Sequence, residues 1–121
     1  MKSSKFVTLN LGIKQKLCDG LLIILADDSI TSLISTLNQF AAAPVLVSKK
    51  NISNANPRYI FINSGNANAC TGDEGSNNVK TILKILANKL KCKPAEIIIM
   101  STGIIGRQLP MSNIIKSISK N

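Results

Sequence analysis

The sequence contains no histidine, and this absence removes whole classes of chemistry from the 121-residue chain. Without an imidazole there is no Ser-His-Asp set, no histidine general base and no histidine metal ligand. The three cysteines, Cys18, Cys70 and Cys92, are odd in number and too widely spaced for a CxxC metal site. They favour free thiols in a reducing compartment, so we expect a cytoplasmic protein with no bound metal.

Aromatic side chains are also scarce, at 3% of residues, and tryptophan is absent. Acidic residues are few as well, six against fifteen lysines and arginines, which gives a net charge of +9. This charge raises the question of nucleic-acid binding. However, few rings are available to stack on bases, and no run of lysines is as long as a basic tail. We therefore favour a lysine-rich surface and no nucleic-acid partner.

Long apolar runs are missing too. The longest run near the start, residues 21–26, is far shorter than the ~20 residues that a transmembrane helix needs. The first fourteen residues lack the apolar stretch of a secretory signal peptide, so we expect no membrane partner. Hydrophobic residues still make up 45% of the chain, which is enough for the core of one domain over residues 1–121.

Apolar runs predict four strands, which we place at residues 20–27, 43–50, 58–64 and 95–101. Pro44 is tolerable at the start of the second of these or on a sheet edge. Residues 29–40 combine β-branched side chains with leucines at helical spacing, so strand and helix both stay open. Residues 51–57 are rich in asparagine and end in proline, which predicts a loop.

Beyond Gly72 the apolar pattern changes to the period of a helix. The residues that define this pattern are Val79, Ile82, Leu83, Leu86 and Leu90. Thr71 and Glu74 stand three apart and predict a capping box at the start of this helix. A second amphipathic helix is predicted over residues 111–120. Strands followed by a helix, another strand and another helix indicate an α/β or α+β fold.

The stretch "NSGNANACTG", residues 63–72, follows the third predicted strand directly. Gly65 and Gly72 can adopt a positive φ, and asparagine tolerates that region better than most residues. Asparagine amides also satisfy buried backbone groups at tight corners. A ligand cradle is the alternative, but the stretch matches neither a P-loop nor GxGxxG. On residue types alone we favour a structural corner.

The stretch "STGIIG", residues 101–106, ends the fourth predicted strand in the same way. Such a turn can direct a backbone N–H and a threonine hydroxyl outward together, as in an oxyanion hole, although an ordinary turn is the simpler reading. Two other candidates are weaker. Asp27 and Asp28 are adjacent, so on a strand they point to opposite faces. Cys70 has no identifiable base, and we expect a small buried thiol there.

Three motifs in order make the chain resemble the N-terminal part of the ornithine acetyltransferase family, the bifunctional glutamate N-acetyltransferases of arginine biosynthesis. They are "AAPVLVS" at residues 42–48, "NSGNANACTG" at residues 63–72 and "STGIIGRQLPM" at residues 101–111. The segments "LGIK" and "TLNQFAAAPV" also align in order. The resemblance implies an ornithine acetyltransferase-like α/β (α+β) fold, with a mixed sheet and flanking helices.

The resemblance also implies an acyltransferase that uses no bound cofactor. Members of the family are longer precursors that cleave themselves before a threonine, which becomes the nucleophile at the start of the β chain. That threonine takes acetyl from N-acetylornithine and passes it to glutamate, and some members also accept acetyl-CoA. The Thr-Gly pair of the family's oxyanion hole corresponds here to the candidate catalytic residues Thr102 and Gly103. The implied assembly is a heterotetramer of two α and two β chains.

The nucleophilic threonine and its cleavage junction do not occur in this sequence, so we expect the chain alone to be inactive. The leading interpretation is an α-chain portion that supplies the oxyanion hole to a β chain. The alternative is a non-catalytic remnant or small-molecule-binding module of the same fold. We also expect Ile114, Ile115 and Ile118 to lack packing partners and to promote self-association.

Overall fold

The computed structural model describes residues 3–15 and 18–121. It contains four strands, three α-helices and one short 3₁₀ helix. In chain order they are β1 (Lys5–Leu9), β2 (Gly20–Ile24), α1 (Ala43–Asn54), β3 (Tyr59–Asn66), α2 (Gly72–Leu90), η1 (Pro94–Glu96), β4 (Ile97–Ile104) and α3 (Met111–Lys120). None of the helices in the described residues is both long and apolar enough to cross a membrane.

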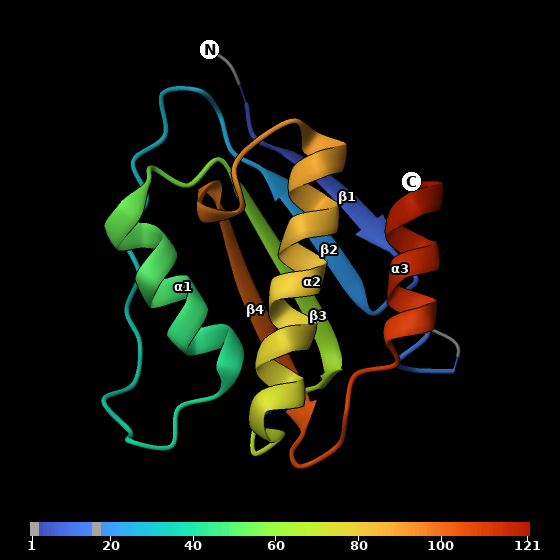
Figure 1. The fold of residues 1–121 in the computed structure, drawn as a ribbon. Coiled ribbons are helices and arrows are strands. Elements are labelled where there is room, and N and C mark those ends of the chain that lie inside the picture. Colours follow the sequence, from blue (N-terminus) through green and yellow to red (C-terminus); the bar gives the residue numbers. More distant parts are fainter. Residues whose placement is uncertain (1–2, 16–17) are drawn as a thin grey trace.

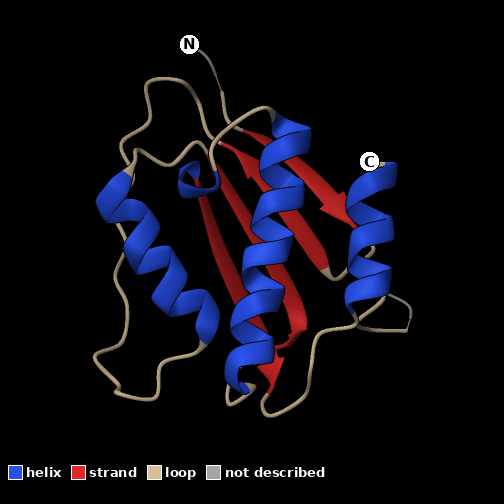
Figure 2. Cartoon of the chain, viewed as in Figure 1, coloured by secondary structure: helices blue, strands red, loops and turns tan. Residues whose placement is uncertain are grey.

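The strands form one mixed sheet in the order β1-β2-β3-β4. The β1–β2 and β2–β3 pairs are antiparallel, whereas β3 and β4 are parallel. Parallel neighbours need a crossover, and α2 supplies it by carrying the chain back along the sheet. Figure 1 shows α2 and α3 in front of the sheet and α1 beside β4. This confirms the predicted mixed sheet with flanking helices (Figure 2).

The core lies between the sheet and the helices. Tyr59 and Phe61 of β3 alternate with half-buried isoleucines, so one face of the strand meets the buried apolar stripe of α2. From α3, Ile114 and Ile118 are buried in the same cluster, and Ile115 is half-buried. The expectation that these isoleucines lack partners is therefore wrong, because α3 packs on the core.

The opposite face of the sheet is also apolar. One row across the strands, in register, consists of Phe6, Ile23, Ile60 and Ile98. The next row consists of Thr8, Leu21, Ile62 and Met100. Phe6 and Met100, on the two outer strands, are 67% and 44% exposed.

Most of the predicted elements are confirmed. Strands occur within or around residues 20–27, 58–64 and 95–101, and both predicted helices are present. The predicted strand at residues 43–50 is wrong, because this segment forms α1 with Pro44 in its first turn. Residues 51–54, predicted as a loop, are the last turn of α1. Residues 29–40 form neither strand nor helix, and β1 was not predicted.

The predicted capping box at the start of α2 is also wrong. No side chain caps this end of the helix in the described residues. Instead, the Thr71 hydroxyl donates a hydrogen bond to Asn68 Oδ1 at 2.7 Å. Thr71 therefore stabilises the preceding loop rather than the first turn of the helix.

Two polar side chains of α1 bind the outer edge of β4. Ser48 Oγ donates to the Ile99 carbonyl at 2.7 Å and accepts from the Ile99 N–H at 2.9 Å. Asn51 Nδ2 donates to the carbonyl of Ile97 at 2.8 Å. These bonds satisfy backbone groups that an edge strand would otherwise leave open. They explain why this apolar segment is stable as a helix.

We predict that Ser48→Ala lowers the free energy of unfolding by about 1–3 kcal/mol, because both backbone groups of Ile99 then lack a partner in a buried place. Urea unfolding measures this. The matched control is Ser53→Ala, an exposed serine of the same helix whose hydroxyl bonds only the Lys49 carbonyl. We expect the control to change the free energy by less than about 0.5 kcal/mol. Equal losses in the two variants would contradict the role of Ser48.

Candidate functional site

The two loops that follow β3 and β4 lie side by side. Because these strands are parallel, their carboxyl ends meet at one edge of the sheet. In register, Asn63 pairs with Ser101, Ser64 with Thr102 and Gly65 with Gly103. The structure therefore brings together residues 63–72 and residues 101–106, the two stretches that the sequence analysis singled out.

Three buried asparagines hold this corner together. Asn63, Asn66 and Asn68 are only 1%, 2% and 0% exposed. Asn63 accepts a hydrogen bond from Ser101 Oγ at 2.5 Å and donates to the Asn66 carbonyl at 2.8 Å. Both polar ends of the Asn63 amide are thus used within the protein.

Asn66 and Asn68 continue the network into both loops. Asn66 Nδ2 donates to the carbonyls of Arg107 and Gln108 at 2.9 and 3.2 Å, and its Oδ1 accepts the Asn68 N–H at 2.8 Å. Asn68 Nδ2 donates to the Gly75 carbonyl at 3.0 Å, which ties the loop to α2. These amides bind backbone groups of the protein itself. The structural corner, rather than a ligand cradle, is therefore confirmed for the asparagines of this loop.

Gly65 and Gly103 are register partners in the parallel strands β3 and β4, with φ of +104° and +129°, and we call their close contact the glycine crossing. A β-carbon added at Gly103 would lie 2.6 Å from the Asn66 nitrogen, and closer still to the Gly65 carbonyl carbon. Real β-carbons do not approach backbone so closely, and side chains rarely adopt these φ values. Glycine is therefore required at position 103 for both conformation and space.

Thr102 and Gly103, the predicted oxyanion-hole residues, are exposed at this edge. Side chains alternate along β4, so Thr102 points to the face opposite Ser101, whose hydroxyl is bound to Asn63. The chain thus places a hydroxyl and a glycine backbone side by side at the carboxyl end of β4, just before the chain bends, and we call this pair the Thr102–Gly103 turn. This geometry suits the stabilisation of a developing negative charge.

A third segment, not singled out from residue chemistry, lies against the same corner. The buried Asp19 carboxylate accepts hydrogen bonds from the N–H groups of Leu11, Ile13 and Lys14 at 2.5, 2.6 and 2.9 Å. The Asp19 carbonyl accepts the Ser64 N–H at 2.8 Å. Asp19 thereby fixes the preceding loop against β3. The sequence signal that could have pointed to Asp19 is its position directly before the strand β2.

The other candidate residues lie elsewhere or differ from expectation. Asp27 and Asp28 follow β2 near the start of β3, which is the opposite end of the sheet. Cys70 is exposed, with φ of +56°, so the expectation of a buried thiol is wrong. Burial, with a further contribution from Glu96, raises the pKa of the Cys92 thiol, and Arg58 partly opposes this. Within the described residues, no group of acidic or cysteine side chains is placed to hold a metal ion.

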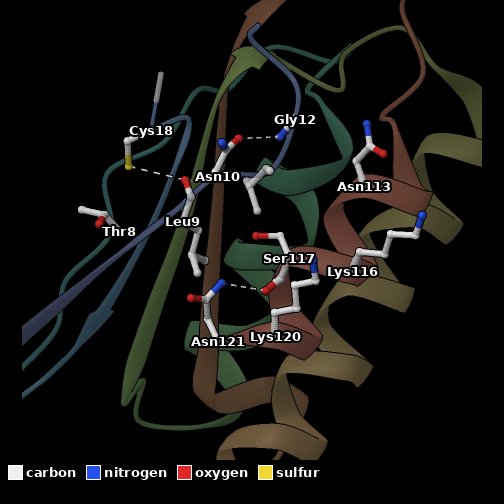
Figure 3. Close-up of a pocket in the computed structure, with 11 residues that line it drawn as sticks. Thr8, Leu9, Asn10, Gly12, Cys18, Asn113, Lys116, Ser117, Lys120 and Asn121 are labelled. Carbon is white, nitrogen blue, oxygen red and sulfur yellow. Dashed lines mark hydrogen bonds between the residues drawn. The ribbon is translucent and has the colours of Figure 1, made fainter. Parts of the chain in front are cut away.

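A cavity of about 620 Å³ lies beside α3 at this end of the sheet (Figure 3). Lys116 and Lys120 line it from α3, and Asn10 and Cys18 line it from the loop between β1 and β2. The Cys18 thiol donates to the Leu9 carbonyl at 3.4 Å. Among the described residues, the lining side chains include two lysines, Lys116 and Lys120, and no carboxylate.

Comparison with known proteins identifies the family. The sequence profile of the ArgJ family matches residues 5–121. The chain belongs to the ArgJ family. It is 39% identical over 114 residues to the arginine biosynthesis bifunctional protein ArgJ of Rhodopirellula baltica, and 42% identical over 113 residues to that of Nitratidesulfovibrio vulgaris. These matches cover 93% and 91% of this chain, and the chain spans 28% of the length of each relative.

Solved ArgJ structures share the fold. The ArgJ protein of Bacillus halodurans superposes with a TM-score of 0.89 at 31% identity, over 97% of this chain and 62% of that one. The ornithine acetyltransferase of Mycobacterium tuberculosis was solved as a complex with ornithine. It superposes with a TM-score of 0.90 at 29% identity, over 98% of this chain and 65% of that one. The resemblance to ornithine acetyltransferases and the ornithine acetyltransferase-like fold are thus confirmed.

We predict that Gly103→Ala lowers the free energy of unfolding by about 2–6 kcal/mol, since backbone strain and steric overlap each cost about 1–3 kcal/mol. The matched control is Gly106→Ala in the same loop. Gly106 also has a positive φ, +78°, but a β-carbon there would meet nothing within 4 Å. We expect the control to cost only about 1–2 kcal/mol. Urea unfolding of both variants measures these free energies. Similar losses of unfolding free energy in the two variants would disprove the close contact of Gly65 and Gly103.

Proposed function

We propose that this ArgJ-family chain is the α-chain portion of a glutamate N-acetyltransferase, which transfers acetyl from N-acetylornithine to glutamate in arginine biosynthesis. One observation carries the proposal. The Thr102–Gly103 turn, which the family resemblance assigns to the oxyanion hole, is exposed and held by the Gly65 crossing. The chain spans 28% of the length of the relatives cited, so the nucleophile is proposed to come from the rest of the enzyme.

In this proposal the hydroxyl oxygen of a β-chain threonine attacks the acetyl carbonyl of N-acetylornithine. The carbonyl oxygen becomes an oxyanion, which the Thr102 hydroxyl and the Gly103 N–H stabilise by hydrogen bonds. The C–N bond then breaks, and ornithine leaves with the proton on its amine. The glutamate amine attacks the acetyl-threonine ester in a second round and releases the threonine hydroxyl.

The asparagine network suits this role because an oxyanion hole must be rigid before the reaction. Donors that need no rearrangement stabilise developing charge more strongly than mobile ones. Ser101, directly before Thr102, is held on the buried Asn63, and the loop after the turn is held by Asn66. These contacts fix the turn on both sides.

The partners in this proposal are a β chain in an α2β2 heterotetramer and the small-molecule substrates N-acetylornithine and glutamate. Acetyl-CoA is an alternative acetyl donor, no resident cofactor takes part, and the site of action is the cytoplasm. A non-catalytic remnant or small-molecule-binding module of the same fold is the competing interpretation. It differs in two measurable respects, because a remnant would have no partner polypeptide and no acetyl transfer.

The test is to purify the chain natively from its own cells, with any bound polypeptide, and to measure transfer of labelled acetyl from N-acetylornithine to glutamate. We expect transfer by a complex and none by the isolated chain. Thr102→Ala should lower kcat by about 10²–10³ with KM little changed, as for loss of one oxyanion donor. The matched control is Thr81→Ala on the exposed side of α2, which should keep the wild-type rate.

A chain recovered alone and without transfer activity would favour the remnant. An active complex in which Thr102→Ala keeps its full rate would leave the family function standing but would remove Thr102 from the oxyanion hole.

A further inference from the structure

Lys14 places a positive charge next to the Thr102–Gly103 turn. Its Nζ donates a hydrogen bond to Ser64 Oγ at 2.8 Å, and Ser64 is the register partner of Thr102. We propose that Lys14 is the cationic member of an anion site at this turn and that its charge favours the oxyanion of acyl transfer. The assignment of the anion as a reaction oxyanion rests on the proposed function.

The backbone of Lys14 is held in place by the buried Asp19. Both carboxylate oxygens of Asp19 are engaged by N–H groups, and one of these groups belongs to Lys14 itself. The Asp19 carboxylate oxygens are therefore bound to N–H groups of the loop backbone. The partner that the structure gives the Lys14 ammonium is a neutral hydroxyl, which leaves its charge available to an anion.

The stem of Lys14 lies across the glycine crossing. A β-carbon added at Gly65 would lie 3.0 Å from Lys14 Cγ and 3.1 Å from Lys14 Cε. On its other side, Gly65 is in contact with Gly103. The Lys14 stem therefore lies beside Gly65, which is itself the register partner of Gly103, and a side chain at position 65 would displace the lysine.

The ammonium group and the Thr102 side chain share one face of the sheet. Ser64 and Thr102 are register partners in parallel strands, so their side chains point the same way. Neighbouring strands are about 5 Å apart, so a hydrogen bond to Ser64 brings the ammonium within reach of a small anion on Thr102. A carboxylate or an oxyanion matches this arrangement of one cation, one hydroxyl and one backbone N–H.

The first experiment uses the 121-residue chain and acetate as the probe. Amide chemical shifts of Thr102 and Gly103 are followed by NMR while acetate replaces chloride at constant ionic strength. We expect saturable shifts in the wild type, with affinity reduced about fivefold in Lys14→Met and largely kept in Lys14→Arg. Lys84→Met, an exposed lysine of α2, removes the same charge far from the turn and should match the wild type.

Ser64→Ala separates the charge from its anchor. It keeps the lysine but removes the hydroxyl, so we expect a smaller loss of acetate affinity than in Lys14→Met. Unfolding midpoints of all variants show whether the fold is kept. The proposal is wrong if wild-type shifts do not saturate, or if Lys14→Met binds acetate as well as Lys84→Met does.

The second experiment measures acetyl transfer by the native complex. For an oxyanion role, Lys14→Met should lower kcat about tenfold and leave KM unchanged, and Lys14→Arg should restore most of kcat. A rise in KM at unchanged kcat would mean that Lys14 holds a substrate carboxylate instead, and would overturn the oxyanion role. If the wild-type complex transfers no acetyl, the proposed function fails, while the acetate titration still decides whether Lys14 belongs to an anion site.

Discussion

The close crossing of Gly65 and Gly103 is the constraint on which the rest of this structure depends. The parallel strands β3 and β4 end at the same register position, and the glycine just before each end has a positive φ. Only backbones without side chains can approach so closely with such φ values. The crossing sets the direction of both loops, and therefore the exposure of Thr102 and the path of Lys14.

Three buried amides stabilise most of the corner around this crossing. Asn63, Asn66 and Asn68 are buried, and each is hydrogen-bonded to the backbone or to a hydroxyl. An amide carries donors and an acceptor without the cost of burying a charge. One carboxylate, that of Asp19, is also buried beside the corner, where loop N–H groups bind it, whereas the Lys14 side chain is exposed. The corner thus combines three buried neutral amides and one buried, hydrogen-bonded carboxylate with an exposed lysine.

Elements whose stability is local could be predicted from the sequence. The apolar periods of β3, β4, α2 and α3 are each readable within one segment, and all four are present. Helix α1 could not be predicted in this way. Its valines favour a strand, and its stability depends on Ser48 and Asn51 binding the distant strand β4.

The same distinction between local signals and long-range contacts applies to the candidate site. Thr102 and Gly103 could be predicted as candidates because a short motif and a family resemblance mark them. Lys14, which we propose for the anion site, was not predicted from residue chemistry because its partner, Ser64, lies 50 residues away in the chain. No local pattern reports a contact of this kind. The buried state of the asparagines was likewise visible only once both loops were in place.

Amide hydrogen exchange in the 121-residue chain tests most directly whether the two loops form one rigid corner. The decisive amides are those of Ala67, bonded to Ile104, and Gly106, bonded to Ala69, because each joins one loop to the other. We expect both to exchange as slowly as the amides in the centre of β3 and β4, since opening them requires the crossing to separate. Exchange as fast as in the irregular residues 29–38 would contradict a preformed corner, and with it a preformed oxyanion hole.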